Sequence, residues 1–115
     1  MKLAEQKAKA VAKGAVPLTA EEARRYLTEI PQWSLEDRTI AREFSFRDFQ
    51  HAMGFVNRVA GIASTQDHHP DIFISYNKVR LTLTTHKVGG LTLNDFIIAA
   101  KIDLVADQQR SEKAA

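Results

Sequence analysis

The feature that most constrains the fold is a change of hydrophobic period at a proline near the middle of the chain. Residues 46 to 65 carry apolar side chains at steps of three and four, which is typical of a helix with one buried face. The pattern ends at His68-His69-Pro70, because a residue before proline is pushed out of helical φ and ψ. From residue 72 onward the apolar side chains alternate, which is typical of a strand. Any fold must therefore turn from helix to strand at this point.

The residues before this helix predict a shorter helix and two strands. Thr19-Ala20-Glu21-Glu22 has the form of a capping box, which opens a helix that runs to about residue 29. A short strand is expected near Trp33, and residues 39 to 46 alternate as a second strand. Arg42 interrupts the apolar side of this second strand.

The residues after the proline predict the same series again. Residues 72 to 76 and 79 to 86 alternate as two strands, with a tight turn at residues 77 and 78. A second capping signature at residues 92 to 95 opens a helix to about residue 107, with Phe96, Ile97, Ala100 and Leu104 expected to face inward.

The element order α-β-β-α-β-β-α predicts an α+β fold. Two hairpins can join as a four-stranded antiparallel sheet, and three helices on one face give a two-layer sandwich. The other face would carry the polar side chains of the strands. It would include His86, which shares one side of its predicted strand with Arg80, Thr82 and Thr84. The expected organisation is a flexible lysine-containing leader (1–16), a single domain (17–107) and a C-terminal tail (108–115).

Composition excludes several classes of function. The 115 residues contain no cysteine, which excludes disulfides, thiolate nucleophiles and Cys-ligated zinc and fits a reducing, cytoplasmic location. No apolar run approaches the ~18 residues of a membrane-spanning helix, and the start lacks the apolar segment of a secretory signal. Residues 1 to 13 carry a net charge of +3 and the remainder −1. We therefore expect no membrane association. We also expect no direct contact with nucleic acid, because a nucleic-acid-binding protein usually has its basic patch on the folded domain.

Three of the four histidines lie at the ends of the second predicted hairpin. With a turn at 77 and 78, residue 71 falls opposite 84, and His86 returns beside His69. The imidazoles could act as proton-transfer groups, because their ordinary pKa is near 6.5. They could equally hold zinc with an open fourth position, or be turn and helix-end residues with satisfied hydrogen bonds. His51 lies within the helix and is expected to be structural or exposed.

Asp95 and the threonines near His86 also allow two interpretations. Asp95 occupies the third position of a helix, which explains it as a capping residue, but it could also reach the histidines. Thr84 and Thr85 are ordinary strand residues whose hydroxyls or backbone groups could also serve a flat polar ligand. Lys87 is most simply a solvated charge. The sequence has no glycine-rich phosphate loop and no nucleophile elbow.

The spacing of these residues resembles a known signature. The pattern consists of His68-His69-Pro70, then Tyr76 after five residues, His86 after nine more and Asp95 after eight more. It is similar to that of the pterin-4a-carbinolamine dehydratase family. The resemblance covers roughly residues 17 to 106. Ser64 departs from it, because the family usually has an acidic or otherwise charged polar residue at this position.

The resemblance implies a dehydratase that removes water from 4a-hydroxytetrahydropterin to give quinonoid dihydropterin, without a metal or a redox cofactor. His69 and His86 would flank the reacting edge of the pterin, with His68 as an acid or anchor. The implied residues are His68, His69 and His86 for catalysis, and Pro70, Thr85, Lys87, Val88 and Asp95 for substrate binding.

The resemblance also implies homodimers or homotetramers, and a protein partner such as an aromatic amino acid hydroxylase. Relatives include a dimerisation cofactor of a homeodomain transcription factor. The alternative function is therefore a non-catalytic role in partner binding or assembly, or a role in molybdopterin metabolism. The departure at Ser64 would be a sign of such a change of function. A metal-dependent hydrolase is the third possibility.

Overall fold

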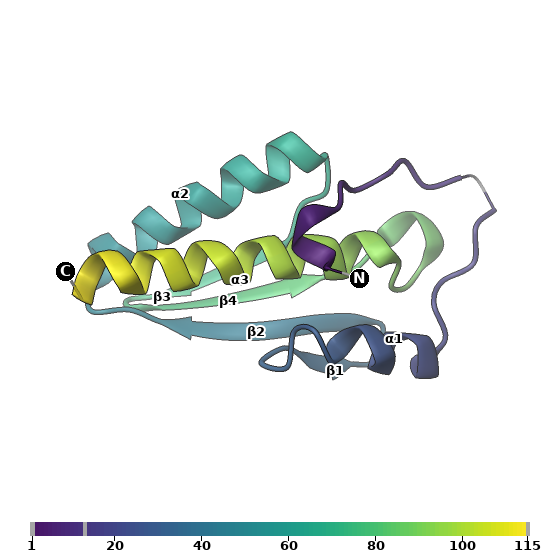
Figure 1. Cartoon of the computed structure of the whole chain (residues 1–115), viewed down its shortest axis with the longest axis horizontal. Coiled ribbons are helices and arrows are strands. Elements are labelled where there is room, and N and C mark those ends of the chain that lie inside the picture. Colours follow the sequence, from purple (N-terminus) through teal and green to yellow (C-terminus); the bar gives the residue numbers. More distant parts are fainter. Residues whose placement is uncertain (1, 13, 115) are drawn as a thin grey trace.

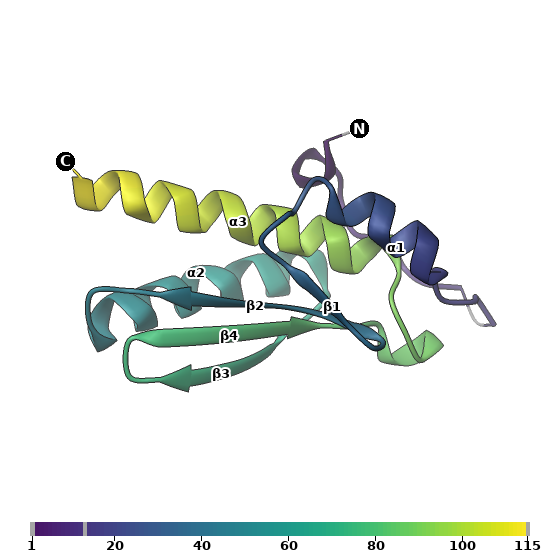
Figure 2. The same cartoon turned by 90° about the horizontal axis from the view of Figure 1, so that it is seen from below.

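Four antiparallel strands form one sheet in the computed structural model, which describes residues 2–12 and 14–114 and the side-chain surroundings up to residue 109. The strands are β1 (Ser34–Glu36), β2 (Thr39–Ser45), β3 (Asp71–Ser75) and β4 (Lys78–Leu83). Their spatial order is β1-β2-β4-β3, and Figure 2 shows β3 at one edge. The prediction that two hairpins join as one antiparallel sheet is confirmed.

The helices are α1 (Ala20–Leu27), α2 (Phe49–Gln66) and α3 (Leu93–Ala114), with short 3-10 helices η1 (Leu3–Glu5) and η2 (His86–Val88). α2 and α3 lie on the same side of the sheet (Figure 1), and α1 packs beside β1 and against the start of α3. The α+β class and the element order are as predicted. No helix among the described residues is long and apolar enough to cross a membrane.

Local capping explains where the first two helices begin. Thr19 Oγ1 accepts from the Glu22 N–H at 3.1 Å, and Glu22 Oε1 accepts from the Thr19 N–H at 2.9 Å, so the predicted capping box is present. α2 begins at Phe49, three residues later than expected, because the Asp48 carboxylate accepts from the His51 N–H at 2.9 Å.

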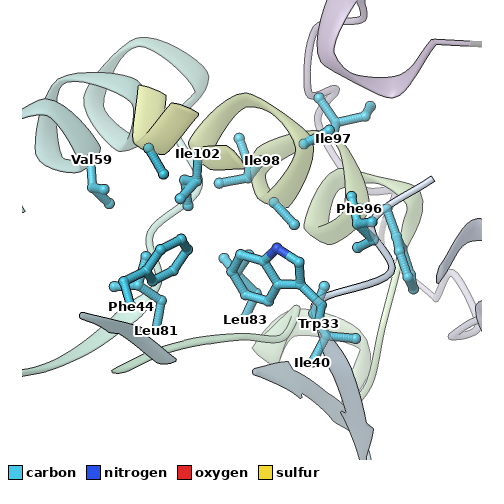
Figure 3. Close-up of a cluster of buried hydrophobic side chains, with 14 of the residues drawn as sticks. Trp33, Ile40, Phe44, Val59, Leu81, Leu83, Phe96, Ile97, Ile98 and Ile102 are labelled. Atoms are coloured by element: carbon cyan, nitrogen blue, oxygen red, sulfur yellow. The ribbon is translucent and has the colours of Figure 1, made fainter. Parts of the chain in front are cut away.

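The core lies between the sheet and the two long helices. Figure 3 shows Phe44, Leu81 and Leu83 of the strands facing Ile98 and Ile102 of α3. The predicted inward face of α3 was partly wrong, because Ile98 and Ile102 are fully buried whereas Leu104 is 52% exposed. α3 is surrounded by α1, the sheet and η1 near its start, so apolar residues occur on every side and do not mark one face.

The second hairpin has a different register from the predicted one. Its turn lies at Tyr76-Asn77, and Asp71 pairs with Thr82 rather than residue 84. Asn77 fixes this turn, because its Nδ2 donates to the Phe46 carbonyl at 2.9 Å and its own carbonyl accepts from the Phe46 N–H at 2.8 Å. β4 ends at Leu83, so His86 lies on η2 and not on the polar face of the sheet, where it was predicted.

Arg42 joins the core instead of interrupting it. Its Nη1 lies 2.6 Å from Asp103 Oδ1 on α3, and its guanidinium lies 4.2 Å from the centre of the Phe44 ring. The Trp33 indole N–H also donates to Asp103 Oδ1 at 2.8 Å. Burial raises the pKa of Asp103, although the hydrogen bond from Trp33 and the charge of Arg42 act in the opposite direction.

Both ends of the chain contribute to the packed structure. Leu3, in the expected leader, is only 1% exposed and belongs to the core cluster. η1 lies against α3, where Lys101 Nζ donates to the Ala4 carbonyl at 2.7 Å. At the other end, α3 continues through residues 108–114, which were expected to form a tail.

Candidate active site

The end of α2 turns the chain towards the start of α3. Asp67 has a left-handed φ of 52°, and its N–H donates to the Ala63 carbonyl. The His68 N–H donates to the same carbonyl at 3.2 Å. This arrangement ends the helix in the way a Schellman-type cap does, and the next residue, His68, lies at the helix end.

Asp95 is the centre of a hydrogen-bond network that includes His68, Thr85 and Thr92, and we call this place the corner. The Asp95 side chain is completely buried, and Oδ1 lies 2.6 Å from His68 Nε2. Oδ2 accepts from the Thr85 hydroxyl at 2.8 Å and from the Thr92 N–H at 3.0 Å. One carboxylate therefore joins the end of α2, the segment after β4 and the first turn of α3. Both sequence interpretations of Asp95 hold, since it caps a helix and contacts a histidine.

The threonine hydroxyls have defined roles within this network. Thr85 is 5% exposed, and its Oγ1 lies 2.8 Å from Thr92 Oγ1. Because the Thr85 hydroxyl donates its proton to Asp95, the Thr92 hydroxyl donates to Thr85. The Thr85 N–H also donates to the Gly90 carbonyl at 2.9 Å, which closes the loop that contains η2.

The three histidines differ in their surroundings. The His68 side chain is 13% exposed, and its Nε2 is hydrogen-bonded to the Asp95 carboxylate. His69 and His86 are exposed, and each follows a member of the network, His68 and Thr85 respectively. The structure therefore holds one imidazole oriented by a carboxylate, and two exposed imidazoles that directly follow members of the network in sequence.

The remaining predicted substrate residues have different surroundings, and within the described part of the chain none of them hydrogen-bonds to Asp95 or His68. Pro70 is half-buried, directly before β3, and Lys87 is exposed with its Nζ donating to the Val11 carbonyl at 2.7 Å. Val88 lines a cavity of ≈ 440 Å³ together with Leu18 and Leu91.

His51 lies apart from this corner, near the opposite end of α2. Its Nδ1 is 2.6 Å from Asp48 Oδ1, and this contact lowers the pKa of Asp48. In the described part of the chain, no group of three or more His, Asp or Glu side chains is arranged to hold a metal ion.

Sequence reasoning missed two residues at this corner. Thr92 was expected only to cap α3, yet its hydroxyl donates to Thr85. Its place in the capping signature was the signal that could have found it. Asn94 is 8% exposed and hydrogen-bonds the main chain of Lys9, a contact between residues 85 positions apart for which the sequence has no signal.

Comparison with known proteins identifies the family of the chain. A sequence model described as Pterin 4 alpha carbinolamine dehydratase matches residues 16–105. A protein of Nitrosomonas eutropha, named as a candidate pterin-4-alpha-carbinolamine dehydratase, is 46% identical over 104 residues, covering 90% of this chain and 92% of the relative. A protein of the same name from Picosynechococcus is 48% identical over 89 residues, covering 77% and 97%.

Solved structures agree with the sequence relatives. A transcriptional coactivator/pterin dehydratase from Brucella melitensis superposes with a TM-score of 0.75 at 38% identity, covering 78% of this chain and 98% of that one. A pterin dehydratase-like protein described as a RuBisCO assembly factor in the alpha-carboxysome shares the fold, with a TM-score of 0.54 at 20% identity and coverage of 64% and 86%. The resemblance seen in the sequence is confirmed, and the chain belongs to the pterin 4 alpha carbinolamine dehydratase family of hydro-lyases.

Proposed function

We propose that this protein removes water from 4a-hydroxytetrahydropterin by histidine acid–base catalysis and so regenerates a pterin cofactor. The observation that carries the proposal is the His68–Asp95 pair, 2.6 Å apart, with exposed His69 and His86 next in sequence to His68 and Thr85 of the same network. Membership of the dehydratase family supports the substrate class.

The reaction needs one acid and one base. The C4a–O bond breaks, and the hydroxyl leaves with an added proton as water. The N5–H bond also breaks, and its electron pair forms the C4a=N5 double bond of the quinonoid dihydropterin. No external oxidant or reductant is needed, because the C4a–O electron pair leaves with the oxygen while the N5–H pair forms the new bond. The proton taken from N5 balances the one given to the hydroxyl. Positioned acids and bases typically each contribute about 10²- to 10⁴-fold in rate.

The surroundings of the histidines suggest different roles. Asp95 holds His68 in one orientation, so His68 suits an acid or an anchor for the ring. His69 and His86 are exposed and would flank the C4a–N5 edge.

The substrate slot would be formed by Pro70, the segment from Thr85 to Val88, and Asp95. The Thr85 hydroxyl is already engaged with Asp95, so Thr85 would contact the pterin through its main chain. Lys87 and Val88 lie on η2 and would contact the ring from the His86 side. Asp95 would act on the ring through His68.

The biological setting completes the proposal. We propose a cytoplasmic homodimer or homotetramer that accepts its pterin from an aromatic amino acid hydroxylase. The edge strand β3 supports self-association, because Phe73 and the adjacent Tyr76 expose 58% and 67% of their surfaces there.

The test is turnover of 4a-hydroxytetrahydropterin generated in situ. The wild-type protein should exceed the spontaneous rate of dehydration, and His69→Ala or His86→Ala should reduce turnover at least about tenfold with cooperative unfolding retained. His51→Ala is the matched control, because it removes an imidazole remote from the corner, and it should behave as wild type. Wild-type turnover in both site variants would exclude these histidines from the mechanism.

A partner-binding role makes the opposite prediction. The Brucella relative carries the name of a coactivator as well as a dehydratase. Turnover no faster than the spontaneous rate, together with stoichiometric capture of a defined protein partner, would refute the proposed catalysis and support the binding role.

A further inference from the structure

Residues 3–11 form a segment that we call the strap, and five side chains of the folded domain hydrogen-bond its main chain. The six hydrogen bonds measure between 2.7 and 3.1 Å. The pairs, domain residue first, are Glu29 with Leu3, Lys101 with Ala4, Gln66 with Ala8, Asn94 with Lys9, and Lys87 with Val11. These contacts are made to peptide N–H and carbonyl groups, so they fix the path of the strap.

The contact between Asn94 and Lys9 is the most specific of these. Asn94 Oδ1 accepts from the Lys9 N–H at 2.9 Å, and Asn94 Nδ2 donates to the Lys9 carbonyl at 2.7 Å. The side-chain amide thus satisfies both polar groups of one strap residue, and Asn94 is only 8% exposed. At the start of the strap, buried Leu3 anchors η1 against α3.

Three of the five domain residues are sequence neighbours of the proposed catalytic groups. Gln66 precedes His68 by two residues, Lys87 follows His86, and Asn94 precedes Asp95. They come from the end of α2, from η2 and from the first turn of α3, respectively. In Figure 1 the purple N-terminal segment passes the end of α2 on its way to α1. The strap therefore connects the three elements that carry the site.

We propose that the strap is a positioning element, which keeps η2 and the end of α2 in register with the first turn of α3. It acts through Asn94, Gln66 and Lys87 and does not itself touch the pterin. The family match begins at residue 16, so the strap lies outside the segment that identifies the family. The kinetic part of this inference rests on the proposed function, whereas its structural part does not.

The test removes one strap hydrogen bond without changing the domain. Lys9→Pro deletes the N–H that Asn94 Oδ1 accepts. Ala10→Pro is the matched control, because the Ala10 N–H donates to no described residue. Lys9→Ala is a second control, which removes the ammonium group and keeps the N–H. Asn94→Ala breaks both bonds from the other side, in case proline disturbs folding.

The expected kinetic result is a loss in kcat and not in KM. Lys9→Pro and Asn94→Ala should lower kcat at least about fivefold, with KM within about twofold, because small displacements of proton-transfer groups slow the chemical step. Both controls should match the wild type. Measurements are made well below the melting temperature, where a merely structural role would leave kcat unchanged. Wild-type kcat in both Lys9→Pro and Asn94→Ala would overturn the proposal.

A second readout needs no substrate. The imidazole NMR signals of His68 and His86 should shift in Lys9→Pro and Asn94→Ala and stay in place in Ala10→Pro and Lys9→Ala. If the wild-type protein lacks turnover, the proposed function fails, and these signals alone decide the role of the strap. Unchanged signals for both histidines in Lys9→Pro and Asn94→Ala would refute it.

Discussion

Replacing Arg42 with methionine should strongly destabilise the fold. The Arg42 side chain is 8% exposed and its partner Asp103 is 21% exposed, so the substitution leaves a largely buried carboxylate without its cation. Breaking a buried ion pair in this way typically costs about 3–5 kcal/mol. Asp103 keeps the Trp33 N–H and some solvent, so we expect the lower limit, about 3 kcal/mol. With a urea m-value of about 1.5 kcal/mol/M, the unfolding midpoint should fall by about 2 M.

The pH dependence of this loss follows from the raised pKa of Asp103. Burial favours the protonated carboxyl in the folded state, so the penalty for the charged form appears as the pH rises through the folded pKa and disappears in acid. Removing Arg42 takes away a group that opposes this shift and raises the pKa further. The difference in unfolding free energy between the variant and the wild type should therefore shrink from pH 7 towards pH ~4.

Two further variants control this experiment. Arg47→Met removes an exposed arginine whose Nε lies 3.7 Å from Asp48, so the unfolding free energy should change by no more than about 0.5 kcal/mol. The double variant Arg42→Met/Asp103→Asn should recover most of the loss, because it leaves no unpaired charge and keeps an acceptor for the Trp33 N–H. Equal losses for Arg42→Met and Arg47→Met, or a loss for Arg42→Met that persists unchanged in acid, would refute the reasoning.

Two other substitutions, Leu3→Ala and Gly90→Ala, test the packing near the strap and the site by urea denaturation, and each has a control. Leu3→Ala should lower the unfolding free energy by about 2–4 kcal/mol, because Leu3 is 1% exposed, whereas Val16→Ala, at an 83% exposed position, should change it by less than about 0.5 kcal/mol. Equal effects would place Leu3 outside the core. Gly90→Ala should destabilise by about 1–3 kcal/mol, because its Cβ would lie 2.8 Å from Pro17 Cβ. Gly54→Ala meets open space within α2 and should stabilise by up to about 1 kcal/mol. Stabilisation by both alanines would contradict the close contact.

Local sequence signals predicted most of the fold. The change of hydrophobic period and the capping box at Thr19 depend on residues close in the chain, so the element order could be read directly. The hairpin register could not, because Asn77 is fixed by Phe46, which lies 31 residues earlier. Arg42 likewise has a partner 61 residues away, and a charged residue in an apolar pattern does not identify its partner.

The candidate site was predicted only in part, because some of its contacts have local sequence signals and others join residues far apart in the chain. The proline after His69 and the capping position of Asp95 are local signals, and they marked the two ends of the His68–Asp95 contact. The strap has no such signal, because its lysines and alanines form no amphipathic pattern. Its path depends on Leu3 and on side chains that come much later in the sequence.

The buried carboxylate of Asp95 limits how this protein can diversify. The same two oxygens orient an imidazole, hold a threonine hydroxyl and cap a helix, so no substitution at this position changes reactivity while sparing architecture. New substrate preferences or a new working pH would instead have to arise from replacements around His69 and His86, because exposed positions accept many side chains without loss of stability. A library that randomises the whole corner and selects for folded protein alone should thus return an aspartate at position 95, before any demand for activity is imposed.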